Sequence, residues 1–292
     1  MTDAAALPLP GPGCAPFVLL DDARVEDAVA ARLFADPVEI LHADGAAEIP
    51  ALLDAVEAAA ARGLHVAGYL AYEGGKGLAP AWRGGAPAGD GTPLGWFGLF
   101  ERVERIDADA VPARLPDPAA SWIGAVEPGI ARADYEAAVE AVLAYIRAGD
   151  IYQANLTFRA AVPVIGNPLA IYARLRRTAR AGYGGFIWTG EQAIASLSPE
   201  LFFGLRGREA IARPMKGTAA RLADAEADGA AARLLATDPK QRAENLMIVD
   251  LMRNDLSRVA EVGSVAVPRL NGLETYANVH HLVSTVTAPL AA

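Results

Sequence analysis

The sequence predicts an α+β fold, and three observations support this prediction. Stretches with apolar residues at every third or fourth position predict helices. Residues 153–162 alternate polar and apolar side chains, which is typical of a half-buried strand. Short apolar strands and helices follow one another without the regular strand–helix–strand order of a parallel sheet. These patterns favour strands and helices mixed along the chain over a repeating strand–helix–strand unit.

Composition limits the classes of protein to which the chain can belong. The chain has 292 residues, of which 53% are hydrophobic and 21% charged, enough to bury a core in one large or two small domains. No apolar run approaches the ~20 residues needed to span a bilayer, so no membrane contact is expected. The net charge of −9 argues against nucleic-acid binding driven by phosphates. The single cysteine, Cys14, fits a reducing cytoplasm.

The first part of the chain predicts one helix and several short strands. An apolar stripe predicts a helix over residues 49–62, which Gly63 ends. Strands are expected at 17–20, 66–72 and 94–100, with a Gly/Pro-rich loop at 84–93. The expected organisation is a loose leader at 1–16, an N-terminal subdomain at 17–106, a linker at 107–121 and a second domain at 122–292.

The second part is more regular. Apolar residues at helical spacing between positions 135 and 146 predict a helix that Gly149 closes. Asn167-Pro168 and Asp238-Pro239 are each a cap followed by proline, so each predicts the start of a helix, the second running to about residue 256. Residues 214–218 predict a turn, and residues 281–287 a last strand.

Lys216 stands in the turn-like segment, between Pro214-Met215 and Gly217-Thr218. A surface lysine is the simplest interpretation, because lysine is rarely buried. If the stiff proline–glycine frame holds Lys216 partly desolvated, its pKa falls and its amine can attack an electrophilic carbon or act as a base. The local sequence leaves both interpretations open.

Two carboxylates also stand beside apolar residues. Glu200 begins an apolar run, so it is either a solvated strand edge or, if it faces inward, a general acid with a raised pKa. Glu244 lies near the start of a predicted helix, where an acid complements the helix dipole. Because Ile248 and Leu251 share its face, that face is expected to be buried, and a buried carboxylate needs a partner such as Mg²⁺.

Two adjacent histidines, His280 and His281, precede an apolar stretch. A histidine on a strand is usually a core or edge residue, so neither position indicates a function when taken alone.

Taken together and in order, five segments resemble the chorismate-utilising enzymes, the family of anthranilate, aminodeoxychorismate, isochorismate and salicylate synthases. The segments are 146–157 (IRAGDIYQANLT), 198–200 (SPE), 214–218 (PMKGT) with Arg221, 242–256 (RAENLMIVDLMRNDL) and 279–284 (VHHLVS). The resemblance covers about residues 122–287, and the part before it is similar to the variable N-terminal half of the same proteins. It implies the chorismate-binding α+β fold, with two packed β-sheets and surrounding helices.

The residue at position 216 separates branches of this family. Anthranilate synthases resemble the same loop but carry alanine there, whereas aminodeoxychorismate synthases carry lysine, so the chain resembles component I of the latter. The resemblance implies that chorismate and ammonia give 4-amino-4-deoxychorismate, on the route to p-aminobenzoate and folate. It further implies a covalent intermediate on Lys216, with Glu200 protonating the departing hydroxyl and His281 beside it.

The resemblance also implies ligands and partners. Gly217 and Thr218 are expected to contact the substrate, and Glu244 to hold part of a Mg²⁺ ion. Ammonia is expected from a separate glutamine amidotransferase subunit. Relatives continue beyond the last matching segment by on the order of a hundred residues, so the catalytic domain is expected to be C-terminally incomplete. Two alternatives stay open: an anthranilate synthase-like enzyme, and a non-catalytic remnant that only binds a partner.

Overall fold

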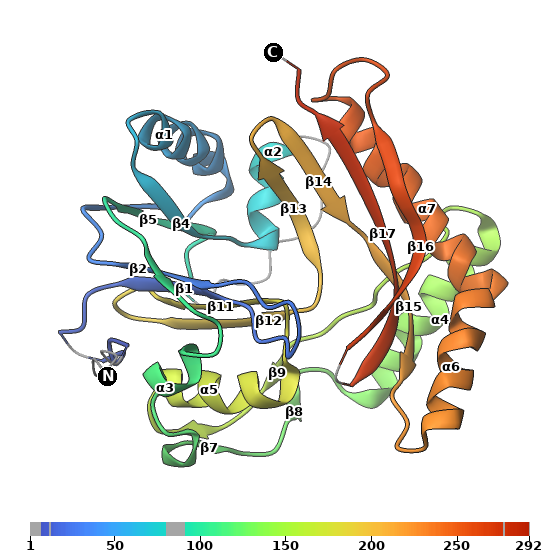
Figure 1. The fold of residues 1–292 in the computed structure, drawn as a ribbon, viewed down its shortest axis with the longest axis horizontal. Helices are drawn as coiled ribbons and strands as arrows, with labels where there is room; N and C mark the ends of the chain where they lie inside the picture. Colours follow the sequence, from blue (N-terminus) through green and yellow to red (C-terminus); the bar gives the residue numbers. More distant parts are fainter. Residues whose placement is uncertain (1–6, 12, 80–90, 277, 292) are drawn as a thin grey trace.

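The computed structural model describes residues 7–11, 13–79, 91–276 and 278–291. All of its paired strands are antiparallel, in two five-stranded sheets, one three-stranded sheet and two two-stranded ones (Figure 1). This confirms the α+β class, with more sheets than the two expected. The expected leader and the 84–93 loop fall partly outside the described residues.

The first five-stranded sheet has the order β12-β11-β1-β2-β6. Its strands are β1 (Phe17–Asp21), β2 (Ala31–Ala35), β6 (Glu104–Ile106), β11 (Tyr183–Trp188) and β12 (Ala193–Ser198). Because β1 pairs with β11, strands from both sides of the expected 107–121 linker share one sheet. Within that linker, Val111 on the short helix α3 (Val111–Arg114) is fully buried.

Alternation along β1 divides the core between the two faces of this sheet. Phe17 and Leu19 pack with Tyr172 of α5 (Pro168–Ala179) on one face. Val18 packs with Trp96 of the three-stranded sheet on the other. That sheet consists of β3 (Glu39–Ala43), β5 (Gly95–Phe100) and β4 (His65–Leu70), and α1 (Ile49–Ala61) and the short α2 (Gly75–Leu78) pack beside it.

The second five-stranded sheet is built around one long strand, β17 (Val279–Pro289). β14 and β15 both pair with β17, β13 extends the sheet beyond β14, and β16 also pairs with β17. The bounds are β13 Leu201–Arg206, β14 Glu209–Arg213, β15 Met215–Ala220 and β16 Ala266–Thr275. Helices α6 (Ala225–Thr237) and α7 (Pro239–Ser257) run along this sheet, as Figure 1 shows at the right.

The helix predictions are confirmed. Asn167 and Asp238 cap α5 and α7 through side-chain oxygens that accept backbone N–H groups, each followed by proline. The predicted 135–146 helix is α4 (Arg132–Ala148), and Gly149 ends it with a left-handed φ of 81°.

One strand prediction and one turn prediction are wrong. Residues 153–162 form no continuous strand: only β9 (Ala160–Ala161) pairs, with β8 (Glu127–Pro128), and a further short pair joins β7 (Trp122–Ile123) to β10 (Val164–Ile165). Side chains at odd and at even positions are exposed along this stretch, Phe158 among them. Neither face is therefore packed against another element, as a half-buried strand requires. The predicted turn at 214–218 is largely strand, because Pro214 stands between β14 and β15 and the chain pairs again from Met215 onward.

Candidate active site

A glycine bulge in β15 fixes the position of the predicted nucleophile. Lys216 pairs with Leu282 and Thr218 with His281, so Gly217 is the extra residue between two consecutive partners on β17. Gly217 has a φ of +85°, and a Cβ there would lie 3.1 Å from the Cβ of Gln241. The bulge therefore requires glycine for both its backbone and its space.

His281 lies directly across from this bulge. Its Nδ1 is 2.9 Å from the hydroxyl of Thr218, and it also hydrogen-bonds the backbone of Gly217. Burial lowers the pKa of His281 below its ordinary value, against the opposing effects of that backbone bond and of the Glu200 and Glu274 charges. A lowered pKa favours the neutral imidazole, which can accept a proton at neutral pH.

Glu200 reaches the same bulge from the loop before β13. Its Oε1 accepts the N–H of Met215, the residue before Lys216, at 3.1 Å. Among the described residues, the ammonium of half-buried Lys216 has no hydrogen-bond or ion-pair partner. The carboxylate of Glu200 and the imidazole of His281 thus lie beside the segment of β15 that carries Lys216, Gly217 and Thr218.

Glu244 lies apart from this group. Its side chain is 36% exposed and pairs with Lys240 across one helical turn, Nζ to Oε1 at 3.9 Å. The prediction that its face of the helix is buried is wrong, because Leu251 on that face is 50% exposed. The buried positions of α7 are Asn245 and Val249, one residue further along.

A Mg²⁺ site is therefore not assembled by the described residues. Mg²⁺ needs near-octahedral oxygen ligands and usually more than one protein or substrate group. In the described part of the chain, no three His, Cys, Asp or Glu side chains form a group that could hold a metal ion, and Glu244 supplies a single carboxylate that already faces an ammonium. Glu244 by itself does not fit a complete metal site.

Sequence reasoning missed two buried polar networks behind the site. Asn245 donates to the carbonyl of Leu282 at 3.1 Å and accepts the hydroxyl of Ser284 at 2.6 Å. Asp228 of α6 accepts from Arg221 and lies 3.0 Å from Nε2 of His280. Asn245, a polar residue among the buried positions of α7, was the available sequence signal for the first network. No local sequence pattern indicated the second network.

A third missed group lies on β16. Glu274 pairs with Arg213 and with Arg269, and accepts the hydroxyl of Tyr276 at 2.7 Å. The Tyr276 ring in turn contacts the ring of His281 edge-on. This group joins the predicted site from the opposite side of β17.

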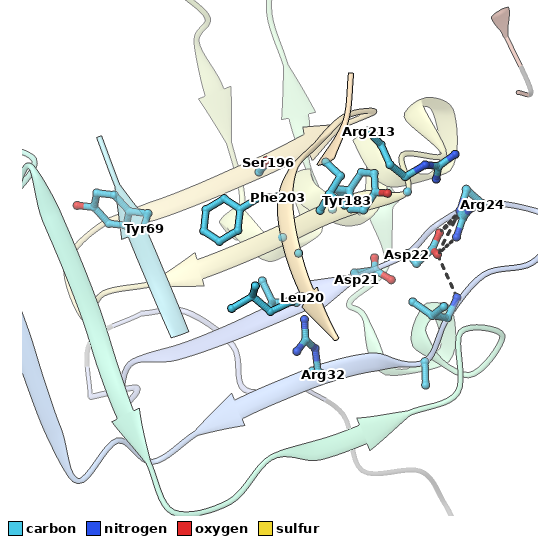
Figure 2. Close-up of a pocket in the computed structure, with 18 of the residues that line it drawn as sticks. Leu20, Asp21, Asp22, Arg24, Arg32, Tyr69, Tyr183, Ser196, Phe203 and Arg213 are labelled. Carbon is cyan, nitrogen blue, oxygen red and sulfur yellow. Dashed lines mark hydrogen bonds and ion pairs between the residues drawn. The ribbon is translucent and has the colours of Figure 1, made fainter. Parts of the chain in front are cut away.

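A cavity of about 750 Å³ lies between the first sheet and strands β13 and β14 of the second, and none of the predicted site residues lines it. Figure 2 shows Leu20, Tyr69, Tyr183 and Phe203 around it, with Asp22 bound to Arg24. The other acidic wall residue, Asp21, binds Arg176 and the hydroxyl of Tyr172. Both carboxylates of this cavity are thus already matched by arginines.

Comparison with known proteins decides the family. A model of the chorismate binding enzymes matches residues 15–292. The chain belongs to the chorismate-binding enzyme family. Aminodeoxychorismate synthase component 1 of Klebsiella aerogenes is 49% identical over 163 residues, 56% of this chain and 36% of that protein. Anthranilate synthase component 1 of Thermus thermophilus is 42% identical over 160 residues, 55% of this chain and 35% of that protein.

The chain spans well under half the length of these two relatives. Among solved structures, anthranilate synthase component I from Streptococcus pneumoniae is similar with a TM-score of 0.74 at 25% identity, over 91% of this chain and 70% of that one. This likeness confirms the chorismate-binding fold. No helix in the described ranges has the length and apolar character of a membrane span.

Proposed function

We propose that this chain carries the lysine-dependent chemistry of an aminodeoxychorismate synthase component I, with chorismate as substrate. The observation that supports this most directly is the amine of Lys216, without a partner among the described residues, beside a glycine bulge that Glu200 and His281 border. A surface lysine would need neither the bulge nor the acid next to it. The similarity to the Klebsiella protein of that name points the same way.

The proposed reaction proceeds in two substitutions. Lys216 gives up one proton, and its free amine attacks C2 of the chorismate ring. The ring double bonds shift and the C4 hydroxyl, protonated by Glu200, leaves as water, because hydroxide itself is a poor leaving group. Ammonia then adds at C4, the C2–N bond breaks and the lysine amine is restored. The balance is chorismate plus ammonia to aminodeoxychorismate plus water.

The remaining residues have supporting roles in this proposal. Gly217 and Thr218 border the substrate, and the neutral imidazole of His281 lies beside the departing hydroxyl. Glu244 is one candidate ligand for the Mg²⁺ expected of the family, and no step of the reaction uses the ion. A glutamine amidotransferase subunit would supply the ammonia, and the cytoplasm is the expected compartment.

Mass spectrometry of the intact chain tests the proposal. Incubation with chorismate in the absence of ammonia should add the mass of chorismate minus water to Lys216, and ammonium should remove that adduct and release product. Lys216→Ala should abolish the adduct and lower product formation by at least about a thousandfold, whereas Lys76→Ala, a lysine on α2, should change neither. Product formed equally by the Lys216→Ala variant would exclude lysine catalysis.

An anthranilate synthase-like activity is the second candidate, favoured by the 42% identity to the Thermus protein. Its product, anthranilate, carries the amine at C2 and forms without a lysine adduct, so the same incubation distinguishes the two. A chain that only binds a partner gives neither product nor adduct, and then retains an amidotransferase subunit in a binding assay.

A further inference from the structure

A row of paired residues crosses three strands of the second sheet beside the bulge. Thr218 of β15, His281 of β17 and Glu274 of β16 are register partners, each directly opposite the next. Directly paired residues point to the same face of a sheet. Tyr276 follows Glu274 by two residues, and its N–H bonds the carbonyl of Val279, which keeps it at the end of the same ladder. The imidazole of His281 is therefore flanked on both sides.

The two flanks of His281 constrain the ring in different ways. On the β15 side, the hydroxyl of Thr218 holds Nδ1 at 2.9 Å. On the β16 side, the ring of Tyr276 meets the imidazole with centroids 5.7 Å apart and an angle of 68° between the planes. The hydrogen bond fixes one ring atom, and the aromatic edge limits rotation of the rest of the ring.

Tyr276 is itself held in place. Its hydroxyl donates to Oε2 of Glu274 at 2.7 Å, while Oε1 of Glu274 pairs with Arg213 and with Arg269 at 2.9 Å. Burial, and then the Glu274 carboxylate, raise the pKa of Tyr276 to about 12, so the hydroxyl stays protonated and keeps donating throughout the neutral range. Glu274 is only 17% exposed. Two arginines thus fix a carboxylate that fixes a tyrosine.

We propose that Tyr276 is a positioning residue for His281, held by Glu274 and its two arginines so that the imidazole faces the Lys216 bulge. Tyr276 acts through His281 and touches no reacting atom. A merely structural tyrosine would not need to lie edge-on against the one histidine that borders the bulge, since the neighbouring His280 is bound elsewhere. The effect on turnover rests on the proposed function, whereas the positioning of the ring does not.

NMR of the histidine rings tests the positioning without any substrate. The chain contains four histidines, so selective histidine labelling gives four ring signals, and His281→Gln assigns one of them. Tyr276→Leu removes the aromatic edge and should shift and broaden the His281 signal while leaving that of His280 in place. Tyr276→Phe keeps the ring and should shift it less. Tyr145→Leu, a half-exposed tyrosine of α4, is the matched control and should change no signal.

The outcomes separate this inference from the proposed function. An unchanged His281 signal in Tyr276→Leu, with the His280 signal showing a folded chain, overturns the positioning role. If Tyr276→Leu does not fold, the graded shift in Tyr276→Phe and Glu274→Gln decides instead. Where the wild-type chain turns chorismate over, Tyr276→Leu should lower kcat roughly tenfold to a hundredfold with KM nearly unchanged. A shifted His281 signal with unchanged kcat would refute catalysis by His281, not its positioning.

Discussion

The two faces of β17 carry different kinds of polar group. On the face toward α6 and α7, His280 and Ser284 are buried and each hydrogen-bonds a partner on a helix. On the other face, His281 is half-buried and shares its surroundings with Thr218 and the charge of Glu200. Strand alternation alone separates the two environments, one residue apart.

This difference separates polar groups that stabilise the sheet from groups that remain available for chemistry. Buried polar groups lower the free energy of folding only when their partners are complete, and the helix-facing set is complete in that sense. Around the bulge, by contrast, Lys216 has no hydrogen-bond or ion-pair partner among the described residues, Glu200 is exposed and His281 is half-buried. We therefore expect substitutions on the first face to change stability and substitutions on the second to change reactivity.

The largest difference between the two faces of β17 is expected when each of the adjacent histidines is replaced by alanine in turn. His280→Ala removes a buried ring, one of the hydrogen-bond partners of buried Asp228 and the partner of exposed Thr275, and should lower the free energy of unfolding by about 2–4 kcal/mol. His281→Ala removes a half-buried ring and should cost less than about 1 kcal/mol. Urea denaturation followed by circular dichroism measures both.

The pair serves as its own control, because the two positions share a strand and a residue type. Equal losses for the two variants would show that the faces of β17 do not differ in the proposed way. A retained lysine adduct in a destabilised His280→Ala chain would further separate stability from reactivity.

Sequence patterns predicted the helices well because caps and apolar stripes are local. Asn167 and Asp238 accept backbone N–H groups within three residues, so neighbouring residues of the sequence determine the first turn of each helix. The strand prediction for residues 153–162 was wrong because alternation predicts a strand only when some other element covers one of its faces. That condition is not local, and Phe158 is 47% exposed in the structure.

The candidate site was predicted from family motifs rather than from chemistry in the residues themselves. The motifs name Lys216, Glu200 and His281, which stay predictions as site residues. The bulge beside them depends on the register of two strands more than sixty positions apart, and a local pattern predicts only a turn there. Bulges between Ala266 and Gly272 similarly break the period of β16, so that strand, with Glu274 at its end, was not predicted. Glu244 was assigned to the wrong face by one residue, 100° of helix rotation.

A second test uses the acid dependence of the buried network. The backbone N–H of Leu222, followed by His280 and Arg221, lowers the pKa of Asp228 from its ordinary value to about 2. A lowered pKa in the folded state means that the ionised carboxylate adds stability above the unfolded pKa and that this contribution is lost as pH falls from about 4 toward 2. The wild-type chain should therefore exceed Asp228→Asn in stability near pH 6, with the gap closing on acidification.

The difference between the two chains isolates Asp228 from the other carboxylates, which titrate in both. A thermal denaturation series between about pH 6 and 2.5 gives the gap directly, and Glu261→Gln, an exposed acid after α7, provides the control with a flat difference. A gap that stays constant down to the lowest pH would mean that Asp228 does not titrate with folding, and that the helix-facing network owes its stability to packing instead.

The smallest expected effect concerns Glu244 of α7, which belongs to neither set of polar groups. A lone carboxylate that is 36% exposed and already paired with Lys240 should bind Mg²⁺ weakly, because hydrated Mg²⁺ gives up water reluctantly for one ligand. Millimolar Mg²⁺ should consequently leave the Tm of the chain within about 1 °C of its metal-free value, with the same result for Glu244→Gln. A ligand raises the Tm only by binding the folded form of the chain. A clear rise in Tm with Mg²⁺ that Glu244→Gln removes would therefore show that the folded chain binds the metal, with Glu244 among its ligands.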